Sequence, residues 1–274
     1  MSAENKKTIT AHCIVRNDEN FVGFALRSVV NQVDTILVFD TGSTDKTVEA
    51  VEQVAKEYPN KIIFEQKGVQ DKISHTYLRQ EMLERTVTDW FMMVDGDEVW
   101  TTRGIEEVLY EIQKINAPSW MIAPYYLCVG DVYHTYYKEK YEPWYRRKGF
   151  YTPRIVRMSS DLVWKGDYEL DTLYYKSTGK NVYTNETDAD LFFLKNKFWH
   201  LTHLRRSSDD NKVFTSGLCK TRAEKRRLTY TFIGKKITES VPEVFVDTPE
   251  GRKMGTLESL IRFMWLTICK PVLI

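Results

Sequence analysis

The 274-residue sequence predicts an α/β protein, and its first hundred residues carry most of that prediction. Short stretches rich in apolar and β-branched residues occur at 8–15, 33–39, 61–66 and 89–94, separated by segments with helical spacing. These strands are continuously apolar instead of alternating, which is typical of parallel strands that are covered on both faces. We therefore expect a sheet flanked by helices and built from strand–helix repeats.

The segments between these strands have the apolar spacing of amphipathic helices, at 21–30, from Thr44 or Asp45 to Pro59, and at 73–84. In the second half we expect a helix at 104–115, a strand at 119–129 interrupted by Pro124, a loop or hairpin at 131–151 and an aromatic strand near Phe198.

Composition and charge exclude several classes of protein. Hydrophobic residues make up 42% and charged residues 28%, which is ordinary for a globular protein, and the net charge of +1 gives no global signal for nucleic acid. The four cysteines are far apart and form no CxxC pair, which disfavours a zinc site and indicates a reducing compartment. The polar start at 1–7 predicts no signal peptide, so we expect a cytoplasmic protein with peripheral membrane contact as an alternative.

The segment Trp90–Glu98 joins a buried strand to a group of carboxylates. Its apolar run stops at Asp95, Gly96, Asp97 and Glu98. Carboxylates are costly to bury without a partner, and their hard oxygen atoms suit Mg²⁺ or Mn²⁺ when a phosphate completes the coordination shell. The alternative is an acidic turn after a strand, because a lone Asp-x-Asp is common.

Polar residues follow three of the predicted parallel strands at their carboxyl ends. These residues are Arg16, Asp40 and Asp95. Ligands of open α/β sheets bind beyond the carboxyl ends of the strands, so the three side chains predict a ligand site there. The sequence contains no GxGxxG after the first strand and no GxxxxGK[ST], which disfavours a dinucleotide-binding enzyme and a P-loop NTPase.

Four segments together carry a resemblance to a known family. They are Val15-Arg-Asn-Asp-Glu19, the stretch 33–47 ending in Asp40-Thr-Gly-Ser-Thr-Asp-Lys-Thr47, Leu78-Arg79 and Trp90–Glu98. In this order and spacing they resemble the family 2 glycosyltransferases of GT-A fold. The resemblance implies a mixed sheet flanked by helices, a nucleotide-diphospho-sugar donor with UDP-sugar favoured, Mn²⁺ or Mg²⁺ as cofactor, and inverting transfer to a hydroxyl acceptor.

The resemblance implies nucleotide-binding roles for matched positions of the first half. Asp40 should accept a hydrogen bond from the base, with Gly42 and Ser43 beside it. The segment from Ala11 to Arg16 should form the floor under the base, and Arg79 should help to hold the nucleotide.

The resemblance also implies a metal site. Asp95, with Gly96, should face the ribose and the metal, and Asp97 should bind the metal that bridges the diphosphate. Relatives carry a histidine later in the chain that completes the metal shell. His200 is the better match and His203 the reserve, whereas the general alternative for either is a structural histidine.

The catalytic base of an inverting transfer is expected from one of three carboxylates. Relatives supply it after a glycine, near a His-Glu pair, but the histidine is absent here and Asp167, Glu169 and Asp171 are the carboxylates present. One carboxylate must take the proton of the attacking hydroxyl. Glu169 is our first candidate for this base, and Asp171 is the second. Their spacing of two would place all three on one face of a strand, which is also compatible with a solvated edge. Arg154 or Arg157 could reach a phosphate, or lie on the surface.

The end of the chain predicts an extension to the catalytic domain. We expect a GT-A catalytic domain over 1–204, divided into a nucleotide-sugar half (1–102) and an acceptor half (103–204), and a basic, mainly helical extension over 205–274. The basic stretch 205–236 suggests a phosphate-bearing acceptor, an anionic membrane or nucleic acid, with a solvated helix as the alternative. The apolar end at 257–274 is short and charged for a membrane span, and would dock on the domain, form a dimer or lie in a membrane interface.

Three functions are compatible with these features. The first is a metal-dependent glycosyltransferase acting on a glycan, a lipid-linked sugar or a nucleic acid. The second is a nucleotidyltransferase, although the turn at 16–20 lacks the glycine-rich basic loop expected of one. The third is an inactive nucleotide-sugar-binding module that has kept the fold.

Overall fold

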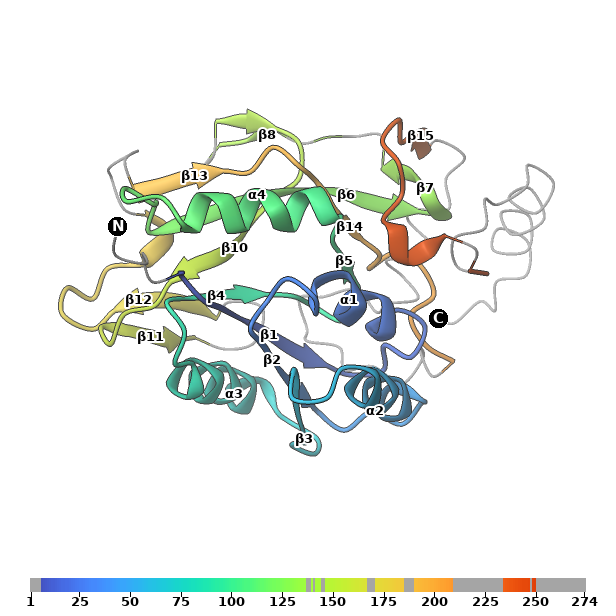
Figure 1. The fold of residues 1–274 in the computed structure, drawn as a ribbon, viewed down its shortest axis with the longest axis horizontal. Coiled ribbons are helices and arrows are strands. Elements are labelled where there is room, and N and C mark those ends of the chain that lie inside the picture. The colour runs from blue at the N-terminus through green and yellow to red at the C-terminus, as the bar shows by residue number, and fades with distance from the viewer. Residues whose placement is uncertain are drawn as a thin grey trace, which may run out of the picture.

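The computed structural model describes residues 6–136, 139, 141–143, 146–166, 171–184, 190–208, 234–246 and 248–249. Its main sheet has the strand order β15-β7-β6-β10-β4-β1-β2-β3, and β13, β14 and β5 join it beside β6. In Figure 1 the parallel strands lie in the lower half of the molecule above α2 and α3, β6 lies in the upper half behind α4, and β7 lies to the right of α4.

The first half forms the parallel part of the sheet, as expected. β1 pairs in parallel with β2 on one side and with β4 on the other, and β3 pairs in parallel with β2. The carboxyl ends of β1, β2 and β4 therefore meet at one edge. The elements are β1 (Ile9–Val15), α1 (Val22–Val29), β2 (Thr35–Asp40), α2 (Thr47–Glu57), β3 (Ile62–Gln66), α3 (Lys72–Arg85) and β4 (Trp90–Met93).

The second half adds antiparallel strands. β10 lies between β4 and β6 and runs antiparallel to both. The described elements are β5 (Glu98–Val99), α4 (Thr102–Ile112), β6 (Trp120–Val129), β7 (Asp131–Tyr136), β8 (Tyr141–Glu142), β9 (Arg147–Lys148), β10 (Tyr151–Arg157), β11 (Leu162–Lys165), β12 (Thr172–Tyr175), η1 (Val182–Thr184), β13 (Leu191–Phe193), β14 (Phe198–His200), β15 (Gly234–Lys236) and η4 (Glu243–Phe245). The sheet is therefore mixed and flanked by helices, which confirms the predicted fold class.

Two helix starts illustrate how the sequence sets the element boundaries. Thr101 caps α4 because its hydroxyl accepts a hydrogen bond from the Gly104 N–H at 3.1 Å, so the helix starts earlier than predicted. Asp71 caps α3 in the same way, accepting from the Ser74 N–H at 2.7 Å. Each cap satisfies a backbone donor that has no partner within the helix.

The expected interruption of a strand at Pro124 is wrong, because β6 continues through it. β13 pairs with β6 at Trp120–Ile122, and β14 pairs with it at Tyr125–Leu127. Pro124 falls in the gap between these two short partners. Its missing N–H therefore removes no hydrogen bond to either of them.

A register shift in β10 marks the position of Arg154. Pro153 lies opposite Ile122 and Ile155 lies opposite Met121, so Arg154 is the extra residue between two regular pairs. A β-bulge of this kind redirects a side chain relative to its neighbours. Here it accompanies an arginine that contacts the acidic loop after β4.

The core lies on both faces of the sheet. Alternate residues of β1, from Ile9 to Val15, pack with apolar residues of α1, α2 and α4 on one face. On the other face Leu78 and Met82 of α3 pack against β2, and the β11–β12 hairpin packs beside α3. Burial of these apolar surfaces is the main favourable term in folding, at roughly 25 cal/mol per Å².

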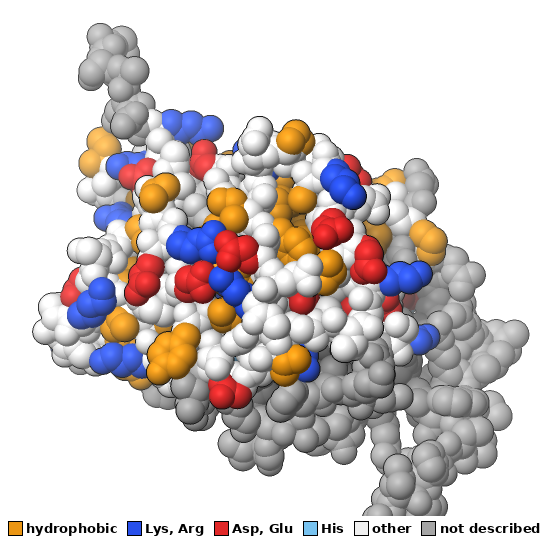
Figure 2. Space-filling model, turned by 90° about the horizontal axis from the view of Figure 1, so that it is seen from below, with side chains coloured by type: hydrophobic (Ala, Val, Ile, Leu, Met, Phe, Trp, Pro, Cys, Tyr) orange, Lys and Arg blue, Asp and Glu red, His pale blue; other side chains and the backbone are white. Residues whose placement is uncertain are grey.

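The edge of the sheet at β3 carries a network of ion pairs. Lys67 contacts Glu65 and Glu81 at 2.7 Å each, and Arg85 contacts the same two carboxylates at 2.6 and 3.2 Å. Viewed from below, basic and acidic side chains gather side by side toward the middle of the face (Figure 2). Charged side chains protect an edge strand from pairing with another chain.

Part of the predicted extension joins the main sheet. β15 pairs antiparallel with β7, and Ile237 and Phe245 pack in a cluster with Trp199 and Leu201. The basic helix predicted at 220–230 and the apolar end at 257–274 lie outside the described residues. Of the wider basic stretch 205–236, the structure describes 205–208 and 234–236. Among the helices that the structure describes, none has the length and apolar character needed to cross a bilayer.

Candidate functional site

The turn after β1 and the loop after β2 are locked together by hydrogen bonds. The Asn17 N–H donates to the Ser43 hydroxyl at 2.9 Å, and the Thr44 N–H donates to the Asn17 side-chain oxygen at 2.8 Å. The Asp18 N–H donates to the Thr47 hydroxyl at 2.7 Å. Asn17 has a φ of 52°, a conformation that asparagine tolerates better than most residues. The result is a rigid rim at the carboxyl ends of the two strands.

Asp40 organises the loop after β2. Its buried carboxylate accepts hydrogen bonds from the N–H groups of Gly42 at 3.0 Å and Ser43 at 3.1 Å, and from the Ser43 hydroxyl. Gly42 has a φ of 84°, and a Cβ there would lie 2.9 Å from the Val69 backbone nitrogen. Asp40, Gly42 and Ser43 are thus brought together, and their contact with a nucleotide base stays a prediction.

The acidic loop after β4 lies against the turn after β1. A Cβ on Gly96 would lie 3.0 Å from an Asp18 carboxylate oxygen and 3.0 Å from a Val15 methyl group, so this close approach requires glycine. The Asp97 carbonyl accepts from the Leu201 N–H at 2.8 Å, which ties the loop to the residues after β14. Asp95, Gly96 and Asp97 therefore lie together beside Asp18, a residue that the motif reading did not select.

Arg154 holds two carboxylates of this loop. Its Nε donates to the Glu98 oxygens at 2.9 and 3.1 Å, and one terminal nitrogen contacts Asp95 at 3.1 Å and also Glu98. Burial raises the pKa of Glu98, while the guanidinium of Arg154 works against this rise. Burial disfavours the charge on Arg154, but the carboxylates of Glu98 and Asp95 outweigh it and raise the arginine pKa. Arg157, by contrast, donates to the carbonyls of the 117–118 turn.

Asp97 faces two side chains from the residues after β13. His200 Nε2 lies 3.7 Å from one oxygen of Asp97, and a terminal nitrogen of Arg206 contacts the other. Arg206 Nε also lies 2.6 Å from Asp18, so this guanidinium bridges two buried carboxylates. Asp18 and Arg206 are thus site residues that sequence reasoning missed.

The surroundings of His200 favour a neutral imidazole. Burial lowers its pKa, which favours the neutral imidazole that metals bind. Its ring meets Tyr125 edge-on, with centroids 5.1 Å apart, and its buried Nδ1 has no hydrogen-bond partner among the residues that the structure describes. His203 lies in the turn three residues further along.

The described residues supply a partial metal shell. Within them, no group of three histidine, cysteine or acidic side chains is arranged to hold an ion. Asp97 and His200 nevertheless face each other, and Asp95 lies in the same loop. A divalent ion bound through one or two carboxylates and completed by substrate phosphates needs no third protein ligand, so this donor set fits Mg²⁺ or Mn²⁺.

Arg79 and Asp171 form a second cluster. Arg79 Nε lies 2.6 Å from an Asp171 oxygen, and His75 Nδ1 lies 3.9 Å from the same atom. The Arg79 guanidinium also lies 5.2 Å from the Trp164 ring centre. Burial and the neighbouring arginine lower the pKa of His75 to about 4. The predicted nucleotide-binding Arg79 is therefore paired with the predicted base Asp171, and His75 was not predicted.

The two other candidates for the base, Asp167 and Glu169, lie outside the described residues. Arg16, whose N–H lies 3.3 Å from an Asp18 oxygen, is placed at the rim as expected.

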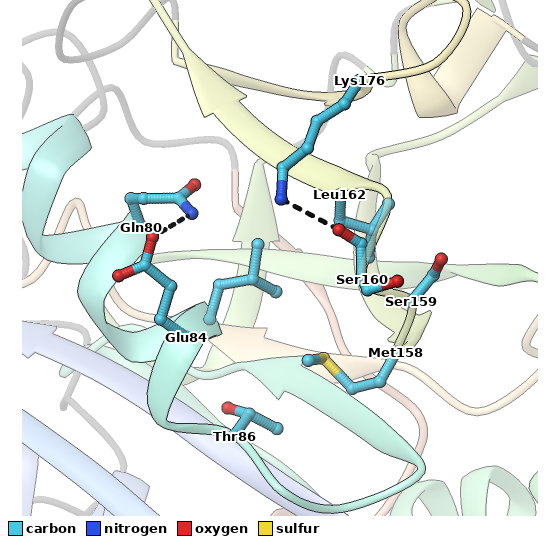
Figure 3. A pocket seen from close by; sticks show the side chains of 9 residues that line it. Gln80, Glu84, Thr86, Met158, Ser159, Ser160, Leu162 and Lys176 are labelled. Carbon is cyan, nitrogen blue, oxygen red and sulfur yellow. Dashed lines mark hydrogen bonds between the residues drawn. The ribbon is translucent and has the colours of Figure 1, made fainter.

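A separate pocket of about 360 Å³ lies between the end of α3 and the turn that joins β10 to β11. Its polar side chains contact each other or nearby backbone, with Gln80 donating to Glu84 at 2.7 Å and Lys176 to the Ser160 carbonyl at 2.8 Å (Figure 3). None of the predicted site residues lines it.

The model of the family described as "Glycosyl transferase family 2" matches residues 11–164, which is more than half of the chain. This chain belongs to glycosyl transferase family 2. The match includes β1, the loop after β2, the acidic loop after β4 and the bulge at Arg154, and the sheet with its flanking helices has the GT-A arrangement.

Two curated relatives of this family 2 chain are similar over a shorter region. They are the SPbeta prophage-derived glycosyltransferase SunS of Bacillus subtilis (strain 168) and the glycosyltransferase SunS of Bacillus phage SPbeta, each 29% identical over 94 residues. The aligned region covers 34% of this chain and spans about a fifth, 21%, of each relative.

Solved structures with a similar arrangement include S. aureus TarS and the mannosyltransferase PcManGT from Pyrobaculum calidifontis in complex with GDP-Man and Mn²⁺. TarS is 11% identical with a TM-score of 0.44, covering 81% of this chain and 42% of TarS. PcManGT is 16% identical with a TM-score of 0.36, covering 44% of this chain and 36% of that one.

Proposed function

We propose that this family 2 chain is a metal-dependent, inverting glycosyltransferase that moves a sugar from a nucleotide-diphospho-sugar to a hydroxyl acceptor. The observation that carries this proposal is the meeting of Asp97 with His200 beside Asp95, at the carboxyl ends of β1, β2 and β4. Such an edge is where α/β sheets bind nucleotides, and these side chains can hold a cation there.

The donor nucleotide would lie along the rim formed by the two interlocked loops. Asp40 fixes Gly42 and Ser43, so the backbone next to the predicted base site is preorganised before the donor binds. Arg16 follows the strand predicted to form the floor of the base site. A uridine nucleotide is our first choice of donor, on the family resemblance alone.

Asp97, His200 and Asp95 would hold Mn²⁺ or Mg²⁺. When bound, the ion would act as a Lewis acid that stabilises the negative charge developing on the diphosphate leaving group. The charges of the contact network agree with this role. Among the described contacts, the carboxylates of Asp18, Asp95, Asp97 and Glu98 outnumber the guanidinium groups of Arg154 and Arg206, and an added cation would reduce this excess of acidic groups. Arg154 would keep Asp95 and Glu98 in place as the donor binds.

The base that activates the acceptor hydroxyl would come from the segment after β11. Asp171 is engaged by Arg79, so a proton accepted there would compete with that ion pair. Glu169 is therefore the first candidate for the base, and Asp171 the positioned partner of Arg79. In an inverting transfer the carboxylate takes the acceptor proton while the hydroxyl attacks the anomeric carbon opposite the diphosphate.

The proposal is tested by a donor-hydrolysis screen. The protein is incubated with a panel of nucleotide sugars and Mn²⁺, with and without cell extract as acceptor, and released nucleoside diphosphate is measured. We expect Mn²⁺-dependent release from one donor and none with EDTA. Release of pyrophosphate from a nucleoside triphosphate and a sugar phosphate would instead favour a nucleotidyltransferase. Turnover of no donor would leave a nucleotide-sugar-binding module.

We also propose a class of acceptor and a cellular location. A glycan, a lipid-linked sugar or a nucleic acid would supply the hydroxyl, and the basic stretch 205–236 motivates the nucleic acid. A protein without salt-dependent retention on nucleic acid would contradict that last choice. A cytoplasmic location, with dimer or membrane contacts through 257–274, is proposed on the sequence alone.

A further inference from the structure

We propose that Arg206 is an internal counter-ion of the metal site, which occupies Asp97 in the donor-free protein and must leave it before a divalent ion binds. This inference rests on the proposed function, because it assigns the metal to Asp97. It adds a competition between a side chain of this chain and the cofactor.

The Arg206 guanidinium lies between two buried carboxylates. One terminal nitrogen contacts an Asp97 oxygen, and Nε lies 2.6 Å from Asp18. The Asp97 and Asp18 side chains are only 2% and 3% exposed, and that of Arg206 only 15%. Two carboxylates buried side by side repel each other and lose hydration, so a cation between them stabilises both.

Hydrogen bonds to the turn after β1 hold the backbone around Arg206 in place. The Arg206 carbonyl accepts from the Asn20 N–H at 3.0 Å, and the Asn20 side chain donates to the Arg205 carbonyl at 2.9 Å. The Ser208 N–H donates to Glu19 at 2.5 Å. The backbone around Arg206 is thus attached to the turn after β1, which places its side chain over the acidic loop.

Arg154 and Arg206 contact different carboxylates of the acidic loop. Arg154 binds Asp95 and Glu98, whereas in the part of the chain that the structure describes Asp97 faces His200 and Arg206. A divalent ion on Asp97 would therefore meet the guanidinium of Arg206 directly. Two cations on one buried carboxylate repel strongly at low dielectric, so one must leave.

The competition predicts that removal of the Arg206 charge tightens metal binding in the absence of donor. Without this guanidinium, Asp97 and Asp18 lose the cation that bridges them, so they attract a divalent ion more strongly. We expect Arg206→Gln to bind Mn²⁺ about tenfold or more tightly than wild type, measured on the full chain by electron paramagnetic resonance of free Mn²⁺. Arg205→Gln is the matched control, since Arg205 is exposed, and should bind as wild type does.

The alternative outcomes separate this inference from the proposed function. Equal or weaker Mn²⁺ binding by Arg206→Gln would overturn the inference, because Arg206 would then coexist with the ion or support it. The double variant Asp97→Asn/Arg206→Gln should lose the added affinity. If it binds as tightly as Arg206→Gln does, the ion is not on Asp97, and the proposed metal position fails together with the inference.

A second variant covers the case in which Arg206→Gln does not fold. Arg206→Lys keeps the positive charge but a single ammonium does not match the fork that bridges two carboxylates. It should bind Mn²⁺ more tightly than wild type and less tightly than a neutral replacement. Mn²⁺ should also raise its thermal midpoint by more than that of wild type, and an equal or smaller rise would contradict the proposal.

Discussion

The two sides of the proposed site, one assigned here to the nucleotide and the other to the metal, are held together by different forces. On the nucleotide side, Asn17, Asp40 and the loop at 41–47 are fixed by short hydrogen bonds to backbone N–H groups and hydroxyls. On the metal side, the carboxylates at 95–98 are held by the guanidinium groups of Arg154 and Arg206, which come from distant parts of the chain.

This difference separates a preformed surface from an exchangeable one. Backbone hydrogen bonds on the nucleotide side satisfy groups that no ligand needs to displace. Ion pairs on the metal side neutralise carboxylates that a cation can also neutralise, so the partner can change when a ligand binds. Variants that remove a single contact on one side or the other test this distinction.

Loss of the shared carboxylate should have the largest effect. Asp97→Asn should lower kcat/KM with the best donor about a hundredfold or more, because the leaving group would lose its metal-held stabilisation. The measurement is Mn²⁺-dependent release of nucleoside diphosphate. Asp34→Asn is the control, since Asp34 is exposed and accepts from the Ile9 N–H at the opposite edge of the sheet, and its activity should stay near that of wild type.

Removal of Arg154 should cost stability. Arg154→Met leaves Glu98 buried without its cation and should lower the free energy of unfolding by about 3 kcal/mol. Arg157→Met, on the same strand but bound to backbone carbonyls, should cost about 1 kcal/mol. Denaturant unfolding compares them. Equal losses would show that the ion pair with Glu98 has no special role.

The nucleotide side should respond to backbone shape instead of charge. Gly42→Ala combines a φ of 84° with a Cβ 2.9 Å from the Val69 nitrogen, and should cost about 2 kcal/mol and raise KM for the donor. Gly68→Ala has a φ of 69° and no atom within 4 Å, so strain alone should cost about 1 kcal/mol, without a change in KM. An unchanged KM for Gly42→Ala would contradict a nucleotide role for this loop.

A buried neutral histidine on β1 should give a pH signature. His12 Nε2 lies 2.6 Å from the Thr86 hydroxyl, and burial, with a smaller effect of Arg79, lowers the His12 pKa to about 3 from 6.5. Below pH 6.5 the unfolded chain binds a proton that the folded chain does not, so stability falls with pH. Between pH 6.5 and pH 4.5 His12 alone should remove about 2 kcal/mol.

The measurement is the free energy of unfolding of wild type and His12→Gln at both pH values. His12→Gln should lose most of the His12 part of the slope, whereas His75 still contributes, because its pKa is also lowered, to about 4. Identical slopes for the two proteins would mean that His12 does not stay neutral in the folded state.

Sequence reasoning found the parts of the site that local strand order determines. Asp40, Asp95 and Asp97 follow apolar strands directly, so their meeting at one edge follows from the parallel pairing. Arg206 and Asp18 were missed, because their contact depends on long-range packing of the residues after β14. The sequence did contain a signal for each residue. Asp18 lies in the turn after β1, and Arg206 lies six residues after His200.

Element boundaries and the path through Pro124 were set by side chains and partner strands that periodicity does not reveal. The cap by Thr101 moved a helix start, and the gap between β13 and β14 accommodated the proline. Arg154 was named as one of two arginines, and the bulge that selects it over Arg157 depends on the pairing of β10 with β6.

The central claim, that nucleotide and metal meet on Asp97, is tested most directly by titration calorimetry of UDP, with GDP as the second nucleotide. Wild type should bind one of them about tenfold or more tightly with Mn²⁺ than with EDTA, and Asp97→Asn should lose this difference, because the ion links the diphosphate to that carboxylate. Equal nucleotide affinity with Mn²⁺ and with EDTA in wild type would contradict the account.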